Sequence, residues 1–336
     1  MSLPALSLQS ISQSATVIVC VDDTDHARNV VRAGASLAGA LDLPLTLLHV
    51  IDSGDKQAGR PDPIDWELRR HLSRQLPARL SKDMALPAGE VRQEALEGEL
   101  VHTICDYAAS SPGSILVIGA TGMVGSAGQG EYQTQRRHTA EQVLEAGACL
   151  VLLVPTRQIV PENPFAKIMV LTDGSDYAEA ALAEAARLAR KTNAELLLTH
   201  VVPRAGLTLF GPPEATDLDL LQLVDLRNQR ASHTFLETTQ RRCADYGIAV
   251  RSLCFKGDVR SMLLRAIAQE KPDLVVVASC GQGGKHCHDL LLGGTAAYLL
   301  AHLAVPMMVV HPAAGRGEQP LRSMVQTRHP ASTFIT

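Results

Sequence analysis

The sequence reads Leu274-Val275-Val276-Val277-Ala278 and shortly afterwards Gly281-Gln282-Gly283-Gly284-Lys285-His286-Cys287-His288-Asp289-Leu290-Leu291-Leu292-Gly293-Gly294-Thr295. The apolar run is typical of a buried strand in a parallel sheet, and residues 296–303 continue in a helical pattern. Glycines between such a strand and such a helix let the backbone approach an anion, at which the first N–H groups of the helix point. The spacing Gly281-x2-Gly284-x9-Gly294-Thr295 therefore predicts a phosphate-binding turn in an α/β fold.

Outward from this stretch, strands and helices alternate along the whole chain. Apolar and β-branched runs predict strands at Thr16–Val21, Leu45–Val50, Val91–Leu96, Ile115–Ile118, Leu150–Val154, Lys167–Asp173, Glu195–Val202, Ala249–Phe255, Leu274–Ala278 and Pro306–Val310. Periodic segments predict helices at His26–Leu41, Trp66–Ala85, Leu100–Ala109, Ala140–Ala146, Ala178–Ala189, Leu220–Tyr246, Met262–Gln269 and Ala296–Leu303. Such alternation favours parallel sheets with helices on both faces.

The second half of the sequence repeats the order of the first. The spacing is 151 residues for the pair Asp22 and Asp173 and for the pair His49 and His200, 159 for Gly98 and Gly257, and 156 for Thr139 and Thr295. Because the length changes fall in loops, the strands stay in step, which indicates an internal duplication. We predict two tandem doubly wound domains, each with a five-stranded parallel sheet, at residues 15–155 and 165–312. Residues 313–336 are predicted to be a disordered tail.

Composition excludes several classes of partner. The net charge is -4 and the pI is near 6.3, so nothing favours binding to nucleic acid or to an anionic membrane. No apolar run reaches the roughly 18 residues of a membrane span, and residues 1–14 lack the pattern of a signal peptide. The seven cysteines are scattered and several lie in apolar runs, which predicts free buried thiols. We therefore expect a cytoplasmic protein.

Each half of the chain resembles a universal stress protein domain, and the whole resembles a tandem member of that family. The family's nucleotide-binding branch has a loop of the form G-x2-G-x9-G-(S/T), which the second half matches at Gly281, Gly284, Gly294 and Thr295. The family's aspartate at the end of the first strand falls on Asp173, and its adenine-contacting backbone position falls on Val201. Its pair of a glycine and an acidic residue after the third strand falls on Gly257-Asp258.

The resemblance implies a Rossmann-like fold, similar to the adenine nucleotide α-hydrolases, with ATP bound in the second half, with or without Mg²⁺. The residues that it implies for this site are Asp173, Val201, Gly281, Gly284, Gly294, Thr295 and Ala296. It also implies that the two halves pair through their last strands, at Leu150–Val154 and Met307–Val310, while a further homodimer stays open. Because the two copies are linked, that pairing requires no second chain.

The first half departs from the family pattern. It keeps Asp22, Val50 and the pair Gly122 and Gly125, but the spacer is then twelve residues long and His138 precedes Thr139. A side chain at the position where a phosphate would touch the backbone is a steric obstacle. We predict that this half binds ATP weakly or not at all, although Arg136 and Arg137 leave room for a different anion.

Simpler interpretations of the same residues stay open. The glycine stretch could be only a tight connection, and Asp173 could be a helix N-cap, a role for which Asp176 competes. Cys280, His286, Cys287 and His288 fit no tetrahedral metal pattern, so no metal site is predicted. His49 and His200 end equivalent strands, which favours a structural role for both.

No enzyme signature stands out in the sequence. A P-loop, a His-x-x-His signature after the first strand, a pyrophosphatase loop and a catalytic triad spacing do not occur. We therefore expect an ATP-binding regulatory protein of the stress response, without catalytic residues and with an unidentified protein partner. The alternatives are a nucleotide-independent scaffold and a slow ATPase or phosphotransferase.

Overall fold

The computed structural model describes most of the chain, in segments separated by loops. These segments are residues 15–52, 63–86, 91–120, 131–147, 149–156, 165–204, 206, 215–281, 292–302 and 304–311. The predicted tail at residues 313–336 lies outside them, as do Gly122, Gly125 and Gly284.

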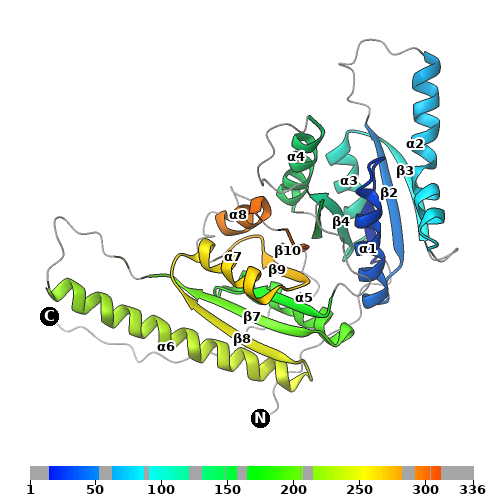
Figure 1. Ribbon diagram of the computed structural model, residues 1–336. Helices are drawn as coiled ribbons and strands as arrows, with labels where there is room; N and C mark the ends of the chain where they lie inside the picture. Colours follow the sequence, from blue (N-terminus) through cyan, green and yellow to red (C-terminus); the bar gives the residue numbers. More distant parts are fainter. Residues whose placement is uncertain are drawn as a thin grey trace, which may run out of the picture.

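Ten strands form one continuous sheet in the order β3-β2-β1-β4-β5-β10-β9-β6-β7-β8 (Figure 1). Neighbouring strands are parallel except at the centre, where β5 and β10 are antiparallel. Each half thus has the doubly wound order 3-2-1-4-5. The strands are β1 (Val17–Cys20), β2 (Leu45–Asp52), β3 (Val91–Gly98), β4 (Ile115–Ala120), β5 (Leu150–Pro155), β6 (Lys167–Leu171), β7 (Glu195–Val202), β8 (Val250–Lys256), β9 (Leu274–Ala278) and β10 (Met307–Val310).

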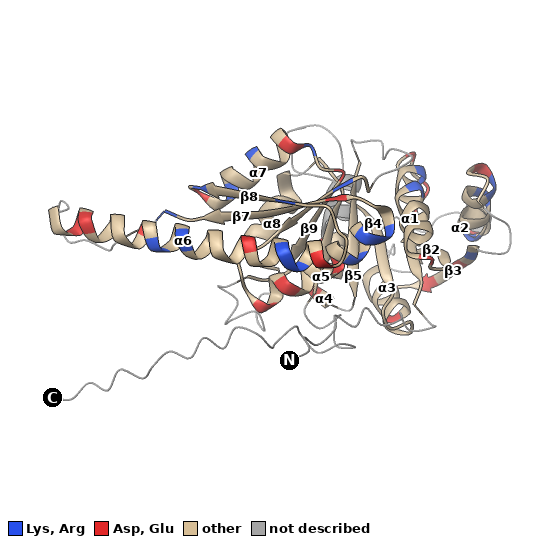
Figure 2. Ribbon diagram, turned by 90° about the horizontal axis from the view of Figure 1, so that it is seen from below, with Lys and Arg blue, Asp and Glu red and all other residues tan. Residues whose placement is uncertain are grey.

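Four helices cover each face of this sheet. One face carries α1 (Ala27–Leu41), α2 (Pro63–Asp83), α5 (Asp176–Thr192) and α6 (Ala215–Asp245). The other carries α3 (Leu100–Ala109), α4 (Glu131–Ala146), α7 (Val259–Glu270) and α8 (Gly294–His302). Charged residues lie mainly on the helices and the edge strands, and the central strands carry almost none (Figure 2). The predicted fold class is confirmed.

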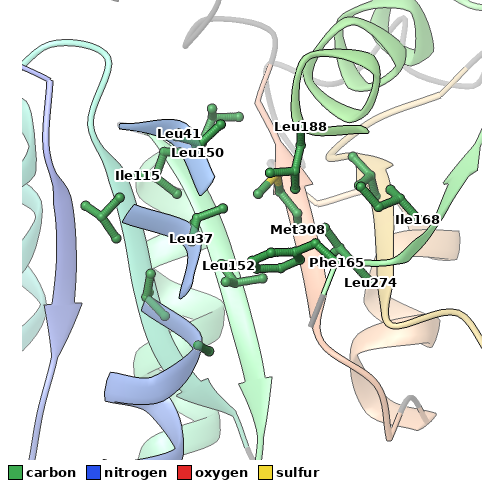
Figure 3. Close-up of a cluster of buried hydrophobic side chains, with 14 of the residues drawn as sticks. Leu37, Leu41, Ile115, Leu150, Leu152, Phe165, Ile168, Leu188, Leu274 and Met308 are labelled. Carbon is green, nitrogen blue, oxygen red and sulfur yellow. The ribbon is translucent and has the colours of Figure 1, made fainter. Parts of the chain in front are cut away.

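The two halves share a hydrophobic core on each face of the sheet. Met307, Met308 and Val309 of β10 pair with Leu153, Leu152 and Val151 of β5, so the predicted pairing of the last strands is present. Alternate side chains enter opposite faces, as the period of a strand requires. On one face, Leu152 of the first half lies close to Phe165 and Met308 of the second (Figure 3). Burial of these apolar surfaces therefore holds the two halves together.

The duplication extends to individual hydrogen bonds. His49 Nδ1 lies 2.8 Å from the carbonyl oxygen of Val21, and His200 Nδ1 lies 2.8 Å from that of Thr172. Each imidazole thus ties the second strand of its half to the end of the first. His200 Nε2 also lies 3.0 Å from the hydroxyl of Ser232 on α6. These contacts agree with the structural role predicted for both histidines.

The cysteines correct one expectation from the sequence. Cys20, Cys105, Cys149, Cys243 and Cys254 are free thiols, of which Cys254 is exposed. Burial raises the pKa of the Cys149 thiol to about 12, so it stays protonated and unreactive. Cys280, in contrast, is disulfide-bonded. The prediction of a free thiol is therefore wrong at Cys280, and scattered spacing gave no signal for this bond.

The helices of the described segments pack against the sheet. Among them, none combines the length and the apolar character that crossing a bilayer requires.

Candidate functional site

The candidate site lies where the strand order of the second half changes direction. The chain runs outward from β6 to β7 and β8 and then returns to β9 on the other side of β6. In doubly wound sheets, ligands bind beyond the carboxyl ends of the two strands at this point. Asp173 follows β6 and Gly281 follows β9, so both predicted residues lie at this position.

Gly281 and Asp173 are in close contact. A Cβ atom added to Gly281 would collide with Oδ2 of Asp173, so a larger residue would force this carboxylate out of its place. Oδ1 of Asp173 accepts a 3.0 Å hydrogen bond from the backbone N–H of Ser175. One carboxylate oxygen thus fixes the local turn, while the other points toward the backbone of the glycine stretch.

The N-cap of α5 is neither of the two aspartates considered from the sequence. Ser175 is the cap, and its hydroxyl accepts a 3.2 Å hydrogen bond from the N–H of Ala178. Asp176 lies in the first turn, where its negative charge interacts favourably with the helix dipole. The alternative interpretation, in which Asp173 or Asp176 caps α5, is therefore excluded, because the turn at Gly174 brings the serine into the capping position.

The end of the glycine stretch returns to the end of β9. The N–H of Gly293 donates a 2.6 Å hydrogen bond to the carbonyl oxygen of Ser279, and Gly293 itself accepts from the N–H of Ala297. This second bond is the first of α8, so the N–H groups of Gly294, Thr295 and Ala296 form the first turn. Such groups have no acceptor within their helix and are available to an anion.

Val201 and Ala296, two further predicted site residues, lie near the end of β7 and in the first turn of α8. Both side chains are buried in the same apolar cluster, between the sheet and the pair α7 and α8. Next to Val201, the carbonyl oxygen of Val202 accepts a 3.0 Å hydrogen bond from the N–H of Gly257, where β8 ends. The predicted site residues that the structure describes thus line the same edge of the sheet. The position of Gly284 lies outside the described residues.

Gly257 and Asp258 form the start of α7. The Asp258 carboxylate caps this helix, because Oδ1 accepts hydrogen bonds from the N–H of Ser261 at 2.9 Å and from its hydroxyl at 2.7 Å. These hydrogen bonds, together with the nearby charge of Arg260, hold the pKa of Asp258 below its usual value. Glu99 caps α3 in the same way in the first half.

Two residues near Gly294 lie outside the sequence motif. Nη2 of Arg260 lies 3.0 Å from the point where a Cβ atom of Gly294 would stand. The Arg260 guanidinium also lies over the ring of Tyr298, 5.2 Å from its centroid. A comparison of the two halves could have singled out these residues, because the positions that correspond to Arg260 and Tyr298 hold Val101 and Gln142 in the first half.

The first half is built differently at the corresponding turn. The sequence pattern places Thr139 just before a helix at residues 140–146, but α4 already begins at Glu131. Thr139 is therefore well inside the helix, where backbone N–H groups are bonded to carbonyls of the preceding turn. The physical reason is that residues 131–139 contain no glycine or proline, whereas Gly293 and Gly294 precede the equivalent threonine of the second half.

Metal ligands do not gather in the described segments. Among these residues, no group of three or more His, Cys, Asp or Glu side chains is arranged to hold a metal ion. His286, Cys287 and His288 lie outside the described residues.

Comparison with known proteins identifies the family. The family model described as the universal stress protein family matches residues 14–155 and again residues 164–311. A universal stress protein of Mycobacterium tuberculosis strain H37Rv is 25% identical over 305 residues, which cover 87% of this chain and 96% of that protein.

A solved structure of a universal stress protein agrees in fold. A universal stress protein from Archaeoglobus fulgidus superposes with a TM-score of 0.63 at 17% sequence identity, over 89% of this chain and 97% of that one. A universal stress protein family member from Arabidopsis thaliana, solved with AMP bound, is 21% identical and covers 44% of this chain and 91% of its own, with a TM-score of 0.31. Because the family model matches both halves, nearly from end to end, the chain belongs to the universal stress protein family.

Proposed function

We propose that this protein is a regulatory protein that binds ATP in its second half, in a domain spanning residues 165–312. The observation that carries the proposal is the meeting of the Asp173 carboxylate with the backbone of Gly281, beside a helix whose first turn begins at Gly294. A carboxylate accepts hydrogen bonds from ribose hydroxyls, and a helix N-terminus donates to phosphate. The two together suit the two ends of a nucleotide.

The proposal assigns each residue a role. Asp173 accepts from the ribose, and the backbone at Val201 contacts adenine beside an apolar wall. Gly281 and Gly284 leave room for the phosphates, and the N–H groups of Gly294, Thr295 and Ala296 donate to them, together with the Thr295 hydroxyl. Mg²⁺, where it accompanies ATP, would be coordinated by oxygen atoms of the phosphates.

The same reasoning leaves the first half without a working phosphate site. Its helix α4 begins eight residues before Thr139, so the N-terminal N–H groups are not at the threonine. We propose one ATP per chain, whose binding changes what the protein contacts. Neither catalysis nor a particular partner is part of the proposal.

Substitution of Asp173 by asparagine tests this function, with Asp22→Asn as its matched control. Asparagine keeps an Oδ1 that can accept from Ser175 but replaces the second acceptor by an amide donor. Loss of a charged acceptor typically costs about 1.5–3 kcal/mol, so we expect ATP affinity to fall roughly 10- to 100-fold. Asp22 holds a corresponding turn by accepting from Thr24, and Asp22→Asn should leave ATP affinity unchanged.

The affinities should be measured by equilibrium titration with ATP, with thermal unfolding as a check that each variant is folded. An unchanged affinity in Asp173→Asn, or a loss that appears only in Asp22→Asn, would show that the second half is not the binding half.

A further inference from the structure

Arg260 stands at the N-terminal end of α8. It is the second residue of α7, and the cap formed by Asp258 fixes the backbone from which it extends. Its Nη2 atom lies 3.0 Å from the empty Cβ position of Gly294. The glycine therefore makes room for a guanidinium at the point where the α8 helix presents its first N–H groups.

Tyr298 holds the guanidinium in this place. The Arg260 Cζ atom lies 5.2 Å from the centroid of the Tyr298 ring, within the range of a cation–π contact. The Tyr298 ring in turn stacks on the imidazole of His302, with centroids 4.1 Å apart and planes inclined by 25°. A stacked guanidinium loses less conformational freedom when it binds a ligand than a free arginine side chain does.

The charge of Arg260 is only partly balanced where it stands: it interacts favourably with Asp258, whose pKa it lowers, but it also lies beside the start of α8. A helix N-terminus carries a partial positive charge, and a cation beside it is repelled. Among the residues that the structure describes, no carboxylate lies within ion-pair distance of Arg260, which is exposed to solvent. The nearest acidic neighbour along the chain, Asp258, is engaged with Ser261. The Arg260 guanidinium and the N-terminus of α8 repel each other, and an anion bound between them would be attracted to both.

Among the described residues, this arrangement is seen in the second half alone. At the positions equivalent to Arg260 and Tyr298, the first half has Val101 and Gln142, neither of which carries a charge. The half that has the glycine-started helix α8 is therefore also the half that has the cation and the ring that orients it. The duplication supplies an internal comparison, because the rest of the α3 and α7 caps is alike.

We propose that Arg260 contacts the phosphates of the bound nucleotide and makes the site select phosphorylated adenine nucleotides over adenosine. The planar guanidinium donates two parallel N–H groups to phosphate oxygens, and the first turn of α8 donates from the other side. This inference rests on the proposed function, since it assigns a further binding residue to the same site. Tyr298 is a positioning residue, which acts through Arg260.

The test compares Arg260→Gln, Arg260→Lys and a control, Arg265→Gln, in the full-length chain. Arg265 is exposed on the same helix, five residues further on, so its substitution removes the same charge. Equilibrium titrations with ATP and with adenosine give an affinity ratio for each variant. We expect Arg260→Gln to weaken ATP binding about 10- to 100-fold and to leave adenosine binding within about twofold. Arg260→Lys keeps the charge but loses the pair of parallel N–H donors, so its ATP affinity should lie between those of Arg260→Gln and the wild type.

The possible results separate this inference from the function on which it rests. Wild-type ATP affinity in Arg260→Gln, with Asp173→Asn still defective, overturns the role of Arg260 and leaves the ATP site standing. An equal loss for ATP and adenosine shows that Arg260 only shapes the pocket, which also overturns the role. If Arg265→Gln loses as much ATP affinity as Arg260→Gln, the effect comes from the overall charge of the protein, which also overturns the role of Arg260. Absence of ATP binding in the wild type overturns the proposed function, and this inference with it.

Discussion

Replacing Gly294 by aspartate is expected to weaken ATP binding by at least about a hundredfold. The new carboxylate would stand where the proposed phosphates meet the start of α8, so it would repel them. It would also lie next to Nη2 of Arg260, which is 3.0 Å from the Cβ position, and would take this guanidinium as its own partner. The substitution therefore removes the proposed phosphate contact of Arg260 and adds one like charge.

Two further variants separate charge from bulk in this experiment. Gly294→Ala adds only a Cβ atom, which the flexible end of Arg260 can avoid, so its loss of affinity should be far smaller. Gly39→Asp places the same carboxylate at an exposed glycine of α1 with nothing within 4 Å, and should bind ATP as the wild type does. Equal affinities for Gly294→Asp and Gly39→Asp, measured by titration calorimetry, would be incompatible with a phosphate at Gly294.

Replacing Gly34 by alanine is expected to lower the free energy of unfolding by about 2 kcal/mol. Gly34 is buried on α1, and an added Cβ atom would collide with a methyl group of Val19, which is fully buried in β1. Val117 of β4 blocks the same space at 3.7 Å from that Cβ position. Because valine is stiff at χ1 and its surroundings are close-packed, the helix itself must move away from the sheet.

Gly39, on the same helix, provides the matched comparison. Its Cβ position is open, so Gly39→Ala should gain about 0.5–1 kcal/mol from the higher helix propensity of alanine. The two variants make the same chemical change in one helix and are expected to shift stability in opposite directions. Urea unfolding followed by circular dichroism measures both. Equal shifts for the two variants would mean that α1 does not pack on β1 and β4 through Gly34.

Much of the fold could be predicted from the sequence because its signals are local and repeated. The buried strands are short apolar runs such as Leu274–Ala278, which lies entirely within the core. The duplication shows each element twice, and the equivalent bonds of His49 and His200 explain why both positions need the same side chain. The location of Asp173 and Gly281 at one edge of the sheet could also be predicted, since both follow strands that are neighbours at the switch point, whereas their direct contact was not predicted.

The features that the sequence did not reveal depend on contacts between elements or on helix ends. The early start of α4 has no sequence motif of its own. Aligning His138 and Thr139 with the turn before α8 suggests that the helix begins later. Residues 131–139 nevertheless contain no residue that stops a helix. Arg260 escapes the sequence pattern because its proximity to Gly294 arises from the packing of α7 beside α8. The bonded state of Cys280 likewise had no spacing signal.

Titration of the wild-type chain with ATP tests most directly whether the second half holds one working nucleotide pocket. Calorimetry on the full-length protein should give saturable binding with a stoichiometry of one ATP per chain, because only the second half starts its helix at the glycine pair. Binding of two ATP molecules per chain would show that the long helix α4 does not disable the first half. No saturable binding at millimolar ATP would contradict nucleotide binding altogether.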